Sequence, residues 1–172
     1  MSLYTASIPA YQQHLKATLT ILDKAIAHCA AKKIEQSVLL NDRIFPDMFP
    51  LVRQFEYVAD HAWNSAARLN GDEPTPPPRE ETTFEQLKDR INKAIAIMDG
   101  VSAAKIDANA DKEVTFPVGP RKATMRGADY MLHFATPNFY FHLTTAYNIL
   151  RMRGIEVGKW DYLGAVPSLK VS

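Results

Sequence analysis

Apolar residues recur every three or four positions over four stretches of the chain, which is the spacing of an amphipathic helix. The first stretch predicts a helix over 8–32, with Ser7 as its N-cap. The second predicts a helix over 50–71, with Asp47 and a proline at its entry and Gly71 as a left-handed C-cap.

The third stretch predicts a helix over 84–100. Thr82 and Thr83 are each followed three residues later by a polar partner, Glu85 and Gln86, which is the spacing of a capping box. The helix therefore begins directly after these threonines.

The fourth stretch offers two starting points. The helix begins near Gly127, or it begins after a break at Pro137 with Thr136 as the cap. In both cases it ends at Gly154, after basic residues that suit the negative end of a helix dipole.

The connections differ in character. Residues 72–81 are rich in proline and predict a stiff, extended segment. Residues 101–127 hold two β-prone runs around Gly119-Pro120 and predict a two-stranded hairpin packed on the helices. The tail after Gly154 is irregular, and we expect its Trp160, Tyr162 and Leu163 to cover one end of the bundle.

Four long helices in a short chain indicate an all-α fold, a four-helix bundle with a small hairpin between helices three and four. We expect one domain over 1–172, because a chain of 172 residues matches one typical domain. The single cysteine, Cys29, excludes an intrachain disulfide and is expected in the core.

The composition limits the kinds of binding partner that we expect. The chain has 20 basic and 19 acidic residues and a net charge of +1, which argues against nucleic acid or a membrane surface as the main partner. No apolar run is long enough to span a bilayer, and the N-terminus lacks the pattern of a secretory signal. A cytoplasmic location is the expectation.

Polar residues lie along the borders of two apolar faces. On a helical wheel Asn138, His142 and Thr145 form a stripe beside the apolar arc of the last helix, and Gln54 and His61 flank that of the second. If these borders face each other, they form a polar pocket between helices, where bundles commonly hold ligands and metals.

Each histidine also has a simpler interpretation. His142 is a metal ligand, a catalytic base or a hydrogen-bonded core residue, and His61 is a ligand or a half-buried side chain. His14 on the first helix is a weaker third ligand. The wheel places Glu56 and Asp60 away from the core, and the sequence lacks the motifs of phosphate-binding loops, serine hydrolases and zinc proteases.

The last helix carries a resemblance to a known family. His142 is followed nine residues later by Arg151 and twelve residues later by Gly154, which resembles the closing helix of the DinB-like superfamily of four-helix bundles. The segments FPDMFPLVRQ, PNFYFH and LRMRGIEVGKWDYLG resemble, more narrowly, an uncharacterised bacterial branch of it, a domain of unknown function.

The resemblance implies a divalent metal site, for Zn²⁺ or Ni²⁺, held by one histidine of helix two and a His-x-x-x-His pair of helix four. His142 matches the second histidine of that pair, and His61 is the histidine available on helix two. The first position of the pair is Asn138, a poorer ligand, so the site is degenerate or rebuilt with His14.

Three functions follow as hypotheses. By the resemblance the chain is a metal-dependent enzyme similar to thiol transferases, with Asn138 orienting a thiol or water. Alternatively, it binds a small molecule in a metal-free pocket. In the third hypothesis, the chain is a structural homodimer. Trp63 is one conceivable dimer contact, unless this side chain packs under the tail.

Overall fold

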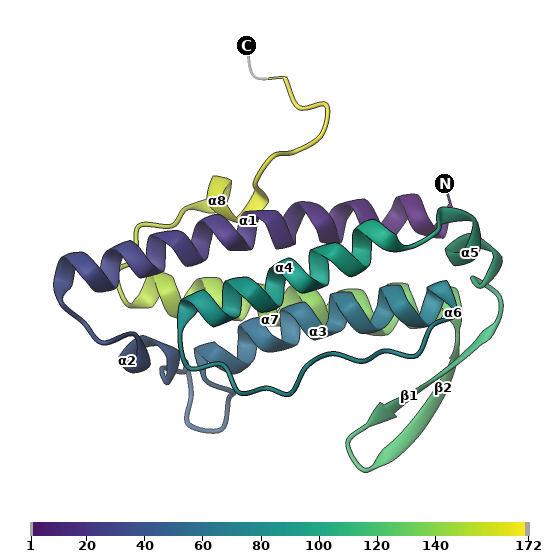
Figure 1. The fold of residues 1–172 in the computed structure, drawn as a ribbon, viewed down its shortest axis with the longest axis horizontal. Helices are drawn as coiled ribbons and strands as arrows, with labels where there is room; N and C mark the ends of the chain where they lie inside the picture. The colour runs from purple at the N-terminus through teal and green to yellow at the C-terminus, as the bar shows by residue number, and fades with distance from the viewer. Residues whose placement is uncertain (1, 171–172) are drawn as a thin grey trace.

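Four long helices lie side by side along the length of the molecule (Figure 1). The structure is a computed structural model that describes residues 2–170. The long helices are α1 (Leu3–Lys32), α3 (Leu51–Asn70), α4 (Phe84–Gly100) and α7 (Thr136–Met152). Helix α3 packs against both α4 and α7, and α1 packs against α4. One apolar core lies between them, so the predicted bundle is confirmed.

Shorter elements connect and cover the bundle. They are α2 (Gln36–Leu40), α5 (Ala103–Ala108), β1 (Glu113–Val118), β2 (Arg121–Arg126), α6 (Gly127–Asp129), the π-helix η1 (Tyr130–Ala135) and α8 (Lys159–Leu163). The two strands pair in antiparallel register around the predicted turn, with Val118 opposite Arg121. Within residues 2–170, no helix combines the length and the apolar character needed to cross a membrane.

The predicted caps at Thr83 and Gly71 are confirmed, and the one at Ser7 is not. The Thr83 hydroxyl accepts a hydrogen bond from the backbone N–H of Gln86, and the Gln86 side-chain oxygen accepts one from the backbone N–H of Thr83. This is the predicted capping box. Gly71 closes α3 with φ near +90°, as predicted. The start predicted for the first helix is wrong: Ser2, not Ser7, caps α1, because Leu3 and the next residues pack on the core and extend the helix.

Of the two predicted starts of the last helix, the one near Gly127 is confirmed, and the alternative break before Pro137 is replaced by a wider helical turn. Thr136 has helical torsions (φ −64°, ψ −48°), so it is not an N-cap, and the helix continues from α6 through η1 into α7. Proline lacks an N–H group, and the π-helical turn accommodates the missing bond without ending the helix. The Asn138 side-chain amide donates to the Phe134 carbonyl at 2.7 Å across this junction.

The tail only partly covers the bundle. It forms the short helix α8 against α1, and the Tyr162 hydroxyl lies 3.0 Å from that of Thr144. Trp160 is 66% exposed, so the expectation that it covers the helices is wrong. The reason is that α8 turns Tyr162 inward, which leaves Trp160, two residues earlier, on the outer side.

The wheel places Glu56 and Asp60 away from the core, but neither side chain is exposed to solvent. Their exposed fractions are 1% and 3%. The proline-rich segment after Gly71 runs back along α3 without regular secondary structure and covers the face of α3 that bears Glu56 and Asp60 (Figure 1). A helical wheel cannot anticipate a cover that comes from a segment without regular structure.

Arg90 of α4 joins this cover to the bundle. Its guanidinium has five N–H donors, and the structure gives each a partner. Nε and Nη2 donate to the Asp60 carboxylate at 3.1 and 2.6 Å. Nη2 also donates to the Pro77 carbonyl at 2.9 Å. Nη1 donates to the Pro78 carbonyl at 3.0 Å and to the Glu81 carboxylate at 2.8 Å. Arg90 is 2% exposed, so a buried cation ties α3, α4 and the proline-rich segment together.

A buried carboxyl pair lies in the same network. The Glu56 side chain contacts that of Glu81 and accepts from Arg53 Nη1 at 2.7 Å. Burial, followed by the hydrogen bond with Glu81, raises the pKa of Glu56 to about 7. Glu81 Oε2 is a buried acceptor without a donor, and a proton held by Glu56 supplies one.

Replacing Arg90 by methionine is expected to lower the free energy of unfolding by about 3–5 kcal/mol, because Asp60 and Glu81 lose their buried counter-ion. Urea denaturation measures the change. Lys93→Met on the same helix is the control, because Lys93 is exposed, and it should change stability by less than about 0.5 kcal/mol. A loss below about 1 kcal/mol for Arg90→Met would contradict the role given to this side chain.

Replacing Glu56 by glutamine is expected to stabilise the protein increasingly as the pH rises from about 5 to 8. The folded-state pKa, about 7, lies above the ordinary 4.5, so the contribution of Glu56 to stability is lost as the pH rises through 7. Glutamine has no proton to lose, and the gain over the parent protein should reach about 1–3 kcal/mol at the upper pH. Urea denaturation at several pH values measures this gain in stability, with Glu80→Gln at an exposed glutamate as the control. A stability difference between Glu56→Gln and the parent protein that does not change with pH would contradict the raised pKa of Glu56.

Candidate functional site

The two histidines of the predicted pocket meet in the structure. His61 lies on α3 and His142 on α7, and these two helices pack against each other. Their ring centres are 5.6 Å apart and their planes differ by 16°. Tyr57, one helical turn before His61, stacks on His142 with ring centres 4.8 Å apart. The sequence therefore located the contact correctly.

Gln54 fixes which nitrogen of His142 carries the proton. The Gln54 side-chain Nε2 donates to the Phe49 carbonyl at 2.9 Å, so its Oε1 is the atom that faces His142 Nδ1 at 2.8 Å. Because Oε1 only accepts, Nδ1 donates and Nε2 keeps its lone pair. Gln54 and His142 are both buried, which holds this tautomer in place.

Both imidazoles are neutral at pH 7. Burial, assisted by His142 and by the cations Arg79 and Arg68, lowers the pKa of His61 to about 3. Burial and Arg79 lower the pKa of His142 to about 4. Two neutral rings beside two guanidinium groups make a site that offers lone pairs and N–H donors and resists an additional positive charge.

The other residues of the predicted site do not bond to the histidine pair. Thr145 donates to the Phe141 carbonyl at 2.7 Å, and Asn138 donates to the carbonyl of Phe134, so both bond within their own helix. His14 is buried elsewhere, with Nδ1 2.8 Å from the Ala10 carbonyl. Its ring neighbours, Phe139, Tyr140 and Tyr162, differ from those of His61 and His142. The structure does not bring His14 to the pair.

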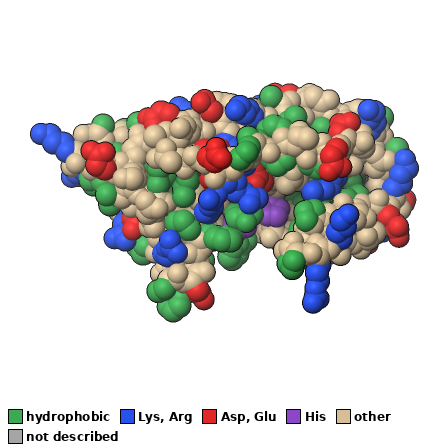
Figure 2. Space-filling model, turned by 60° about the horizontal axis from the view of Figure 1, so that its bottom comes forward, with side chains coloured by type: hydrophobic (Ala, Val, Ile, Leu, Met, Phe, Trp, Pro, Cys, Tyr) green, Lys and Arg blue, Asp and Glu red, His purple; other side chains and the backbone are tan. Residues whose placement is uncertain are grey.

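A cavity of about 150 Å³ opens beside His61. Its lining comes from α3, the proline-rich segment, β1 and η1: Tyr57, Asp60, His61, Asn64, Arg68, Arg79, Phe116, Pro117, Tyr130 and Phe134. Figure 2 shows a histidine side chain in a hollow of the surface, between basic and hydrophobic side chains. A cavity of this volume accommodates a molecule about the size of benzene.

Sequence reasoning missed most of this lining, for two reasons. Asn64 and Arg68 follow His61 by three and seven positions, so helical spacing alone places them on the same face. That signal was available. Arg79 and Phe116 come from the extended segment and the hairpin, whose positions over α3 depend on tertiary packing.

The polar groups of the cavity are unevenly satisfied. Arg79 Nε donates to Asp60 at 2.7 Å, and its guanidinium carbon lies 4.1 Å from the centre of the Tyr57 ring. Arg68 donates to the Tyr130 hydroxyl at 2.9 Å, and within residues 2–170 no carboxylate pairs with it. Asn64 Oδ1 is buried without a donor. The cavity therefore holds an uncompensated cation and an unused acceptor.

The donors present do not fit the implied metal site. An ion about 2 Å from a nitrogen of each ring would place the ring centres about 5–6 Å apart, so the spacing of His61 and His142 is suitable. A third strong ligand is missing: the described part of the chain contains no group of three histidine, cysteine, aspartate or glutamate side chains placed to hold an ion. Asp60, the carboxylate of the cavity lining, already accepts from two arginines.

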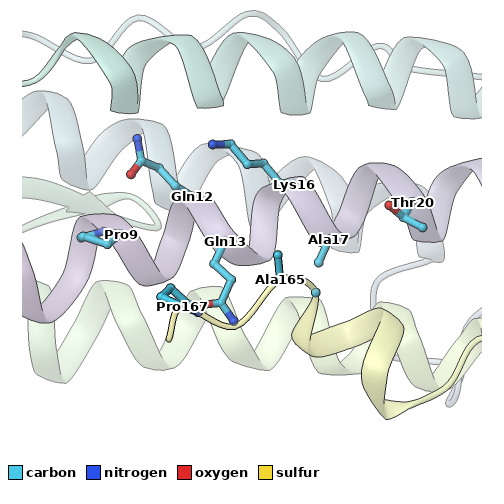
Figure 3. A pocket seen from close by; sticks show the side chains of 9 residues that line it. Pro9, Gln12, Gln13, Lys16, Ala17, Thr20, Ala165 and Pro167 are labelled. Atoms are coloured by element: carbon cyan, nitrogen blue, oxygen red, sulfur yellow. The ribbon is translucent and has the colours of Figure 1, made fainter. Parts of the chain in front are cut away.

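A larger hollow lies along α1 and shares no lining residue with the His61 cavity. It measures about 420 Å³ and lies between α1 and the segment after α8 (Figure 3). Its lining is Pro9, Gln12, Gln13, Lys16, Ala17, Thr20, Gly164, Ala165 and Pro167. Lys16 is its one ionisable side chain, and Gln13 is used to bind the Leu163 carbonyl at 2.7 Å. The chemistry favours the smaller cavity.

Comparisons with known proteins agree with the architecture. The family model of a domain of unknown function (DUF1993) matches residues 3–163. The crystal structure of a DinB family member from Shewanella denitrificans is 38% identical, with a TM-score of 0.88, and the match covers 98% of this chain and 96% of that chain. No curated protein matches. The similarity therefore includes α3 and α7, the helices that carry the histidines.

Proposed function

The chain belongs to the family described as a domain of unknown function (DUF1993), a DinB-like family, and we propose that it binds a small organic anion in the His61 cavity without a metal ion. The observation that carries this proposal is the combination of Arg68, which has no carboxylate partner within the described residues, with the unpaired buried Asn64 Oδ1. A buried acceptor is normally satisfied, so Asn64 Oδ1 calls for a donor, and the half-buried Arg68 in the same lining favours an anionic ligand that supplies it.

The charge of the cavity favours an anion. Arg68 and Arg79 both line it, while Asp60, its one carboxylate, is neutralised by Arg79 and Arg90. The guanidinium group binds carboxylates in two-point contacts. The same cations lower the pKa of His61, so an anion that reaches them should raise that pKa again.

The acceptors of the cavity favour a ligand that also donates a hydrogen bond. Asn64 Oδ1 lacks a donor, and a neutral imidazole offers a lone pair on one nitrogen. A hydroxyl group next to the carboxylate would satisfy such an acceptor while the carboxylate faces Arg68. A short 2-hydroxy acid combines both groups and is small enough for about 150 Å³.

This proposal is preferred over the metal-dependent enzyme that the resemblance implies, because His61 and His142 lack a third ligand. Trp63 is half-buried and packs against the core, which gives no support to its use as a dimer contact. A homodimer and a cytoplasmic location stay predictions.

We expect 2-hydroxybutanoate to bind with a Kd of about 1 mM or below and to shift the imidazole signals of His61 in NMR titrations. Butanoate, which leaves Asn64 unpaired, should bind about five- to tenfold more weakly. Arg68→Met should weaken the binding of 2-hydroxybutanoate at least tenfold, because it removes a charged hydrogen bond. The control Arg151→Met removes an exposed arginine of α7 and should change the Kd little.

Two results would overturn this proposal. One is the absence of any shift at His61 with both acids. The other is stoichiometric uptake of Zn²⁺ or Ni²⁺ at neutral pH that is lost in His142→Ala, which would restore the metal site.

A further inference from the structure

Four aromatic rings form a continuous row beside the cavity. Phe49, Tyr57, His142 and Phe141 follow one another with ring centres 5.1, 4.8 and 5.2 Å apart. The two inner rings belong to the site already described. The outer rings, Phe49 and Phe141, are 48% and 56% exposed.

The row is continuous with the cavity. Tyr57 lines the cavity and also stacks between Phe49 and His142. Figure 2 shows hydrophobic side chains gathered beside the hollow that holds a histidine. An apolar surface thus extends from the polar cavity outward.

The outer end of the row is held in place. The Phe49 carbonyl accepts from Gln54 Nε2, the same amide whose Oε1 orients His142. The backbone of Phe49 is therefore held relative to the histidine pair, and its ring stacks on Tyr57. Aromatic side chains next to a cavity offer a large contact area for few rotatable bonds.

The exposed area of the row suits a small molecule better than a protein. Two half-exposed aromatic side chains offer about 200 Å², whereas a stable protein interface buries about 800 Å² on each partner. At Tyr57, next to the exposed Phe49, the row meets a cavity with cationic side chains. These properties match an occupant with an acidic head and an apolar tail.

We propose that the ligand of the cavity is amphipathic: a 2-hydroxy acid whose polar end lies at Arg68 and Asn64 and whose alkyl chain lies along the rings of Tyr57 and Phe49. This inference rests on the proposed function and adds the class of ligand. Burial of each methylene contributes about 0.8 kcal/mol, so the chain length sets the affinity.

The test compares 2-hydroxyoctanoate with 2-hydroxybutanoate by calorimetry or NMR titration. Each methylene buried on the row should lower the Kd about fourfold, so the longer acid should bind at least tenfold more tightly. Phe49→Ser should narrow this difference in Kd by threefold or more, and Phe141→Ser, beyond the buried His142 ring, should narrow it less. Both residues are exposed, so the variants retain the core, and Trp160→Ser, at a 66% exposed aromatic of α8, should leave the difference unchanged.

The outcomes separate the two proposals. Equal affinities of the two acids, or a difference in affinity that Phe49→Ser leaves intact, would overturn the amphipathic ligand while the cavity proposal stands. Binding of neither acid would overturn the cavity proposal and this inference with it.

Discussion

The buried ion pair between Arg90 and Asp60 is the constraint on which the arrangement of the site depends. A buried arginine is tolerated because all five of its N–H donors have acceptors on α3 and the proline-rich segment. Through these bonds a segment without regular structure is held against the bundle. Asp60 in turn accepts from Arg79, so the same carboxylate places a second guanidinium in the cavity wall.

The histidine pair and this network act on each other through charge. The positive charges of Arg79 and Arg68 add to burial and keep His61 neutral, while Gln54 orients His142. A neutral, oriented ring is suitable both for accepting a hydrogen bond and for binding a metal. The number of further ligands decides between these uses, and within the described residues no group of three histidine, cysteine or carboxylate side chains is placed to hold an ion. Arginines and aromatic residues surround the two rings.

Much of this could be predicted from the sequence because it depends on local periodicity. The four helices, the capping box at Thr83 and the hairpin follow from residue spacing and turn chemistry. So does the meeting of His61 and His142, since each lies at the border of an apolar face. The failures around the cavity share one physical cause. Glu56, Asp60, Arg79 and Phe116 acquire their environment from irregular segments that fold over α3, and helical phase contains no information about such a cover. The π-helical turn before Pro137 likewise reflects packing that overrides a local signal.

The central claim is that two neutral imidazoles, one oriented by Gln54, form a hydrogen-bonding site. Long-range ¹H–¹⁵N NMR of the histidine side chains tests it most directly, since it reports the charge of each ring and the nitrogen that bears the proton. At pH 6 the account predicts that His61 and His142 are both uncharged, because their pKa values lie at about 3 and 4, with the proton of His142 on Nδ1. A positively charged ring at that pH, or a proton of His142 on Nε2, would contradict it.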